Sequence, residues 1–279
     1  SAALRLRANG FSGAVSIIGA EAEPPYQRPP LSKKLLTREI SRERLLLRPL
    51  EVYEQLEISL HLGRTVQRID RAARTLLLDD ERRLGYGRLL LATGTRSRRL
   101  PDSLAGGFSN LFSLRTFDDT LRLQEEMLPG RRLLVIGGGY IGLETAAVAR
   151  KLGLEVVLVE QAERILRRVA AEDTARHFRE LHLREGVKIL ESARLKAFEG
   201  ADVRATAARL SDGRRLPFDL AVVGVGVSVN GELAEAAGLE VADGIIVDGF
   251  CRTSDPAIFA AGDCTSFPFQ GGRLRLESV

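Results

Sequence analysis

The sequence is poor in cysteine and histidine. Its 279 residues include only Cys251 and Cys264, and they form no CxxC pair. This argues against a zinc site, a disulfide framework and a thioredoxin-like dithiol. The three histidines also lack the grouping of metal ligands. Two of them, His177 and His182, lie five positions apart on one expected helix, where we expect both at the surface. No metal site is predicted.

Long apolar runs are missing as well. No window approaches about 18 consecutive apolar residues, and the start, "SAALRLRANG", lacks the apolar run of a secretory signal. We therefore expect a cytoplasmic protein with no membrane partner. Lys and Arg exceed Asp and Glu by 41 to 37, a net charge of +4 that is too mild to indicate nucleic acid. A pI of about 9.3 nevertheless suits an acidic protein partner.

Two series of elements follow one another along the chain. In the first, a helix (1–9) and a strand (13–21) precede a Pro-rich loop, "PPYQRPPLSK" (24–33), which we expect to be extended and not helical. Short strands punctuated by turns (56–95) predict an antiparallel meander, and 96–116 reads as a connector. The second series repeats the plan: a helix from 117, strand 131–138, helix 140–152, strand 154–160, helix 171–185, strand 187–191, a meander over 194–218 and a last strand over 219–227.

This repeated plan predicts an α/β protein with two nested Rossmann-like domains, each of three layers in the order ββα. We expect a discontinuous dinucleotide-binding domain over 1–116 and 243–279, and a second dinucleotide-binding domain over 117–242.

The stretch "VIGGGYIGLE" (135–144) carries the strongest motif. Gly137, Gly139 and Gly142 follow a strand and open a helix, and the next strand ends at Glu160, eighteen positions after Gly142. In such a turn the first glycine permits the tight bend, the second lets the backbone approach a pyrophosphate, and the third allows close helix–strand packing. Tyr140 and Ile141 complete the turn. A carboxylate at Glu160 would bind a ribose hydroxyl and repel a 2′-phosphate, so NAD is favoured over NADP.

No glycine turn precedes the strand of the first series. A helix tail, "VSIIG" and Glu21 look like the second half of a βαβ unit, and "LRLESV" (274–279) ends without a closing element. We therefore expect a chain truncated at both ends, whose first βα turn is absent.

Several segments, read in order, resemble the flavoprotein ferredoxin reductases of the putidaredoxin reductase, rubredoxin reductase and dioxygenase ferredoxin reductase type. These are "PPYQRPPLSK", "LLLATGT", "SLRTFDD", "VIGGGYIGLE", "GVGVSVN", "RTSDPAIFAAGDC" and "LRLESV". The resemblance spans essentially all of the chain and extends to the fold of the pyridine nucleotide-disulfide oxidoreductases. It implies that the domain over 1–116 and 243–279 binds FAD, that the domain over 117–242 binds NAD, and that a C-terminal interface domain is absent. It also implies that a chain starting at Ser1, without the first glycine turn, binds FAD weakly.

The resemblance implies roles for individual residues. Lys33 would lie beside the flavin ring, with Glu144 as its ion-pair partner near the nicotinamide. Asp263 would bind the flavin ribityl chain, and Arg115 would lie near the flavin phosphates. Glu21 is only a substitute for the aspartate that the family often has after Gly19, where Ala20 stands here. The other residues expected at the cofactors are Val66, Thr93, Gly94, Gly226, Gly262 and Val279.

The implied function is electron transfer from NADH through FAD to a [2Fe–2S] ferredoxin or rubredoxin that serves an oxygenase. We expect a monomer or weak homodimer without a nucleic-acid partner. Two alternatives stay open: an NADH oxidase or nitrite-reductase-type flavoprotein, and an NAD-binding module without flavin. Most such oxidases place a redox-active cysteine near "RPPLSK", where this chain has none.

Overall fold

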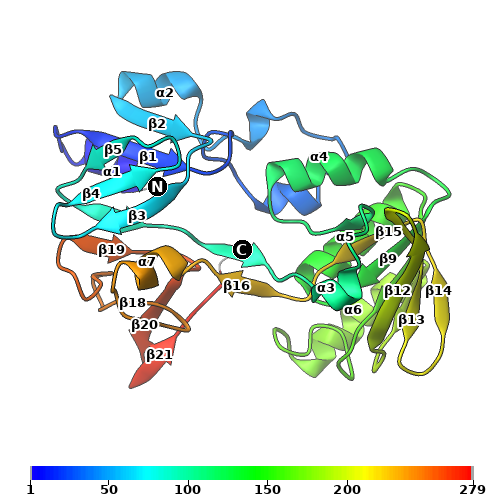
Figure 1. Ribbon diagram of the computed structural model, residues 1–279. Helices are drawn as coiled ribbons and strands as arrows, with labels where there is room; N and C mark the ends of the chain where they lie inside the picture. Colours follow the sequence, from blue (N-terminus) through cyan, green and yellow to red (C-terminus); the bar gives the residue numbers. More distant parts are fainter. Residues whose placement is uncertain (1, 278–279) are drawn as a thin grey trace. The chain divides into compact units, whose positions relative to one another are not determined.

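The computed structural model describes residues 2–277 and divides into two compact units (Figure 1). Unit 1 comprises Ser1–Tyr26, Leu46–Arg96 and Ser228–Val279, and unit 2 comprises Gln27–Leu45 and Ser97–Val227. These boundaries differ from the expected domains, because 27–45 and 97–116 belong to unit 2 and 228–242 to unit 1. The chain passes from unit 1 to unit 2 within β7 (Thr95–Ser97) and returns to unit 1 within β16 (Val227–Val229).

Unit 2 is built on a five-stranded parallel sheet. Its strand order is β11-β10-β9-β15-β8, so the strand before the glycine turn lies in the middle. The strands are β8 (Leu111–Phe112), β9 (Arg132–Ile136), β10 (Glu155–Val159), β11 (Val187–Leu190) and β15 (Leu220–Val223).

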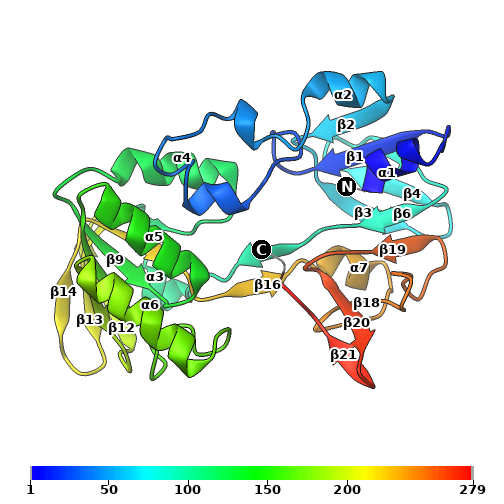
Figure 2. The ribbon, with the colours of Figure 1, turned by 180° about the vertical axis from the view of Figure 1, so that it is seen from behind.

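Alternate side chains of these strands enter two separate cores. Leu133 and Val135 pack with the helices, while Leu134 and Ile136 pack with an antiparallel meander on the other face. Figure 2 shows α5 and α6 together in front of β9, with the meander behind. This is the expected ββα layering. The helices are α4 (Phe117–Glu126), α5 (Tyr140–Lys151) and α6 (Glu172–Arg184), and the meander is β12 (Leu195–Ala201), β13 (Arg204–Leu210) and β14 (Arg215–Pro217).

Charged pairs brace the rim of unit 2. Glu126, at the end of α4, accepts hydrogen bonds from Arg204 at 3.0 Å on each carboxylate oxygen and also binds Arg131. The Arg204 hydrogen bonds, joined by that of Arg131, lower the pKa of the Glu126 carboxyl against the opposing effect of burial. Because Arg204 begins β13, this pair ties the meander to the helical layer.

Unit 1 combines short parallel pairs with meanders. A small core joins Ala3, Val15, Tyr53 and Ile58, where α1 (Ala2–Ala8) and α2 (Leu50–Gln55) pack on the parallel pair of β1 (Val15–Gly19) and β2 (Ile58–Leu62). A second core gathers under α7 (Glu232–Ala236), from β3 (Val66–Asp70), β4 (Thr75–Leu78), β6 (Leu89–Leu91), β18 (Gly244–Ile246) and β19 (Ile258–Ala260). The remaining strands are β5 (Arg83–Gly85), β17 (Val241–Ala242), β20 (Thr265–Phe269) and β21 (Gly272–Leu274).

Three expectations about local structure were wrong. The antiparallel meander expected over 56–95 comprises β3, β4 and β5, whereas β2 and β6 pair in parallel with β1 and β19. The Pro-rich loop contains a short 3-10 helix, η1 (Pro29–Ser32), because prolines at its first positions cost no hydrogen bond where the backbone N–H has no intrahelical acceptor. The connector 96–116 contains β8, which pairs in parallel with β15, and a short helix, α3 (Asp102–Ala105). No helix within residues 2–277 is long and apolar enough to span a bilayer.

Candidate dinucleotide-binding site

The turn between β9 and α5 packs too tightly for any side chain at two of its glycines. Gly137 has φ +105°, and a Cβ there would lie 2.3 Å from the Gly224 carbonyl oxygen. A Cβ on Gly142 would lie 2.0 Å from the Gly137 carbonyl oxygen. Gly139 differs, because a Cβ there would meet nothing within 4 Å. The turn is therefore closed toward the sheet and open beyond Gly139, as a pyrophosphate site requires.

Within residues 2–277, the N-terminus of α5 faces this opening without a side-chain cap. Gly139 is the N-cap and has no side chain to accept from the first backbone N–H groups, and the first turn of α5 holds no acidic residue. Tyr140 and Ile141 lie there with 48% and 39% of their surface exposed. Unsatisfied N–H groups and the helix dipole favour an anion at this end, so the turn fits the phosphates of a dinucleotide.

Glu160 lies directly after β10, beside the turn. Its Oε2 accepts from the Gly138 N–H and its Oε1 from the Ala162 N–H, each at 2.6 Å. A carboxylate has about four acceptor positions, so positions remain for a ribose hydroxyl. The same charge disfavours a phosphate.

Lys33 and Glu144 lie together in unit 2 although 110 residues separate them in sequence. Lys33 Nζ is 2.7 Å from Glu144 Oε1, and the Ser32 hydroxyl donates to Glu144 Oε2. Ser32 is the last residue of η1 and is 2% exposed, and Glu144 lies in the second turn of α5. The expected ion pair is thus present, and Ser32 is an additional partner.

Arg115 and Gly226 are also part of unit 2. The Arg115 backbone is held from both sides: its N–H donates to Asp119 at 3.0 Å, and its carbonyl oxygen accepts from Arg28 at 2.7 Å. Gly226 follows β15, and its carbonyl oxygen accepts from the Arg98 N–H at 2.9 Å.

The residues expected at the flavin in unit 1 follow the carboxyl ends of parallel strands. Gly94 follows β6, and Gly262 and Asp263 follow β19, its parallel partner. A Cβ on either glycine would meet nothing within 4 Å, so the space beyond these strand ends is open. Such ends are where α/β sheets bind ligands.

Other expected residues of unit 1 have structural partners. Thr93 Oγ1 donates to the Asn230 carbonyl oxygen at 2.7 Å, and Asn230 Nδ2 donates back at 2.8 Å. Glu21 follows β1 and accepts from the Tyr26 hydroxyl at 2.5 Å. Val66 is half-buried and pairs with Leu78. Val279 lies outside the described residues.

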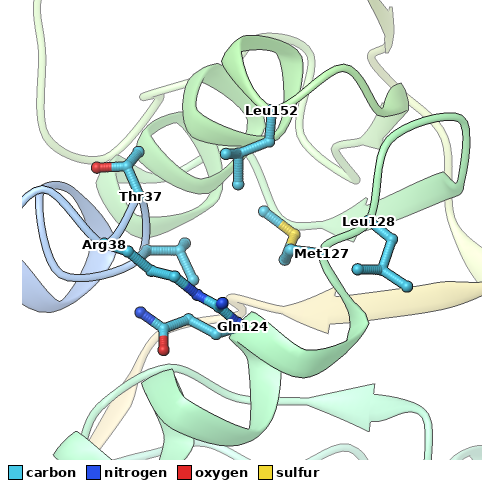
Figure 3. A pocket seen from close by; sticks show the side chains of 7 residues that line it. Thr37, Arg38, Gln124, Met127, Leu128 and Leu152 are labelled. Carbon is cyan, nitrogen blue, oxygen red and sulfur yellow. The ribbon is translucent and has the colours of Figure 1, made fainter.

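A cavity of about 200 Å³ lies elsewhere in unit 2 (Figure 3). Its lining is mostly apolar, with the Arg38 side chain extended toward Gln124. Leu152 lines it from the C-terminal end of α5, about 18 Å along a twelve-residue helix from the glycine turn. None of the predicted site residues lines this cavity.

The expectation that His182 lies at the surface was wrong. His182 is 7% exposed, whereas His177 is exposed. Nδ1 lies 2.8 Å from the Phe178 carbonyl oxygen and Nε2 3.1 Å from that of Leu143. The ring therefore joins α6 to α5 beneath the glycine turn, a structural role that the spacing on one helix could not reveal.

Sequence patterns missed two contributors to the site. The first is Ser32, buried against Glu144. The second is the segment 161–170, which follows Glu160 and folds against the turn, with the Leu166 N–H donating to the Gly138 carbonyl oxygen at 2.9 Å. In the sequence, 161–170 is notable for its arginine content. Such content is typical of a solvated loop, so it did not indicate that the segment contributes to the site.

The layered parallel sheet, the glycine turn and the carboxylate after the next strand define unit 2 as a dinucleotide-binding unit. A search against family models matches the pyridine nucleotide-disulphide oxidoreductase family over residues 1–279. The chain belongs to this family, whose members use FAD and NAD(P)H. The family, the fold class and the cofactors expected from the sequence are confirmed.

Its relatives include ferredoxin reductases. The chain is 41% identical over 281 residues to a ferredoxin–NAD(P)+ reductase of Sphingomonas sp, covering 99% of this chain and 68% of that protein. It is 42% identical over 280 residues to rhodocoxin reductase of Rhodococcus erythropolis, covering 100% and 65%. Putidaredoxin reductase, solved in covalent complex with putidaredoxin, matches with a TM-score of 0.95 at 40% identity, covering 99% and 68%. The chain thus spans about two thirds of the length of these relatives. Their names are those of reductases, the class of enzyme that the sequence predicts.

Proposed function

We propose that this chain is the FAD- and NADH-binding part of a flavoprotein reductase that passes electrons to a [2Fe–2S] ferredoxin or rubredoxin serving an oxygenase. The observation that carries the proposal is the glycine turn with Glu160 beside it and an uncapped α5 N-terminus, in a chain about 40% identical to ferredoxin reductases. The mild positive charge suits an acidic acceptor protein.

FAD, when bound, supplies the step between a two-electron hydride donor and a one-electron acceptor. The chain's own residues bind and orient. Glu160 would select the unphosphorylated ribose of NADH, and the α5 N-terminus would hold its phosphates. Lys33 and Glu144 would fix the charges around the reacting rings, and Ser32 would hold the Glu144 carboxylate in one orientation. The hydride step requires no protein acid or base.

In unit 1 the flavin would be held by groups at the strand ends. Asp263 would accept hydrogen bonds from the ribityl hydroxyls, and the open backbone at Gly94 and Gly262 would let the cofactor approach. Arg115 would pair with a flavin phosphate. We also propose a cytoplasmic location, as expected from the sequence.

Purified protein should be supplied with FAD and NADH, and the absorbance of an added [2Fe–2S] ferredoxin followed. Reduction of the ferredoxin, lost or slowed in Asp263→Asn, supports the proposal. NADH-dependent oxygen consumption without ferredoxin reduction would indicate the oxidase alternative. NADH binding with no FAD binding would indicate the module without flavin.

A further inference from the structure

The segment 161–170 covers one side of the glycine turn. Leu166 is 3% exposed and has φ +53°, a left-handed conformation that costs a non-glycine residue about 1 kcal/mol or more. Its N–H bond to Gly138 and its buried side chain hold it there. The Tyr140 hydroxyl also lies 3.4 Å from the Val169 carbonyl oxygen. The segment is therefore fixed against the turn.

Three arginines belong to this segment, and two have partners. Arg164 donates to the Ala170 carbonyl oxygen at 3.0 Å and to that of Ile165 at 3.3 Å. Arg167 pairs with Glu163 at 2.8 Å on the exposed face. Arg168 is exposed and, among residues 2–277, makes no hydrogen bond or ion pair with protein groups.

The Arg168 guanidinium nonetheless has a defined place. A Cβ on Gly226 would lie 3.2 Å from Arg168 Nη2. Gly226 follows β15, whereas Glu160 follows β10, and β9 with its glycine turn lies between those strands. Arg168 therefore reaches across the turn, to the side opposite the ribose-binding carboxylate.

We propose that Arg168 binds the pyrophosphate of NADH, an inference that rests on the proposed function. The α5 N-terminus supplies N–H donors and partial positive charge to a diphosphate, but it provides no full countercharge. An arginine with an unused planar fork beside the same turn supplies that charge and can donate two parallel hydrogen bonds to phosphate oxygens. Its position on the β15 side separates it from the ribose 2′ position, which belongs beside Glu160.

The test compares Arg168→Ala with Arg167→Ala, a matched change one position away in the same segment. Binding of NADH, NADPH and ADP-ribose is measured by calorimetry, and folding by thermal unfolding. We expect Arg168→Ala to raise the Kd of both NADH and ADP-ribose by about tenfold to a hundredfold, the range for a lost charge-assisted contact. Arg168→Lys should restore part of the affinity, and Arg167→Ala should change neither Kd by more than about twofold.

Other outcomes would overturn the assignment. Equal losses in the two alanine variants would indicate general surface charge, and a loss for NADH but not ADP-ribose would place Arg168 at the nicotinamide half. A loss confined to NADPH would place it at the 2′-phosphate. Wild-type protein that binds neither NADH nor ADP-ribose would overturn the proposed function and this inference together. Unchanged binding in a nucleotide-binding Arg168→Ala protein would overturn the inference alone.

Discussion

Replacing Glu160 with glutamine should weaken the preference for NADH over NADPH. The substitution keeps the size of the side chain and removes its charge. In the wild-type protein both carboxylate oxygens accept backbone N–H groups, from Gly138 and Ala162, so the charge is held in a fixed position beside the turn. A 2′-phosphate in this place would face that charge directly.

The size of the effect follows from Coulomb's law. Two like unit charges about 4 Å apart repel by about 1 kcal/mol in bulk water and about 4 kcal/mol at an effective dielectric constant of about 20. Wild-type protein should therefore bind NADH at least about tenfold more tightly than NADPH, since about 1.4 kcal/mol is a factor of ten. Glu160→Gln should reduce this ratio at least about fivefold. Glutamine has one side-chain oxygen where glutamate has two, so one backbone N–H loses its acceptor and the free energy of unfolding should fall by about 1 kcal/mol.

The assay is the Kd of each nucleotide, measured by calorimetry at fixed ionic strength, with denaturant unfolding of the same preparations. Glu163→Gln is the control, because it removes an exposed carboxylate from the same segment and leaves Glu160 in place. A folded Glu160→Gln protein with the wild-type ratio would show that other groups read the ribose. An equal change in Glu163→Gln would show that the effect is general electrostatics.

Four further predictions concern the turn, the ion pair, acid stability and the partner. Gly142→Ala should destabilise unit 2 by about 1–3 kcal/mol and weaken NADH binding, because its Cβ would lie 2.0 Å from a backbone oxygen of the turn; wild-type unfolding and Kd would refute the packing argument. Lys33→Met should slow flavin reduction by NADH in stopped-flow measurements while changing the unfolding free energy by less than about 1 kcal/mol, because the 2.7 Å pair with Glu144 is half-exposed; an unchanged rate would mean that the pair is purely structural. The pKa of Glu126 is lowered by its bonds to Arg204, so its stabilisation is present above the unfolded pKa of about 4.3 and is lost as pH falls through the folded value. Wild-type protein should therefore lose more unfolding free energy than Glu126→Gln between about pH 6 and about pH 3, and parallel losses would contradict this. Electron transfer to an acidic ferredoxin should slow as salt rises, because the chain carries a net charge of +4 and the Debye length is about 10 Å at 0.1 M; a rate independent of ionic strength would exclude charge steering.

The features most accessible from sequence were those whose geometry is local. The glycine turn and the carboxylate after the next strand lie on consecutive elements, so spacing alone indicated both. Lys33 and Glu144 were different: each alone reads as a solvated charge, and only the resemblance paired them. The 3-10 helix at Pro29–Ser32 was not predicted, because its prolines argue against a helix. Proline is disfavoured inside a helix but tolerated at its first positions.

Features that depend on tertiary packing were not accessible. The ring of His182 is buried where it contacts a carbonyl oxygen of another helix, α5. The periodicity of apolar residues in α6 alone gives no sign of that contact. Arg167 and Arg168 are adjacent and chemically identical, yet Arg167 pairs with Glu163 and Arg168 extends to Gly226. The fold of the segment after Glu160 decides between these two outcomes, and a left-handed Leu166 is part of that fold.

The discontinuity of unit 1 has a consequence for how the chain folds during synthesis. Leu89 in β6 pairs with Ile258 in β19, and residues 97–227 of unit 2 are made between them. The five-stranded sheet of unit 2 is complete once β15 has emerged, whereas β6 must wait for its partner, and closing so long a loop is slow. We therefore expect unit 2 to fold first on the ribosome, with the apolar faces of β4 and β6 exposed meanwhile to chaperones and to aggregation. Unit 2 also takes Leu36 into its core from 27–45, so expressing 97–227 alone would leave that core incomplete. A chain in which a linker replaces residues 46–96, so that 27–45 is joined to 97–227, is the form in which unit 2 should be produced by itself.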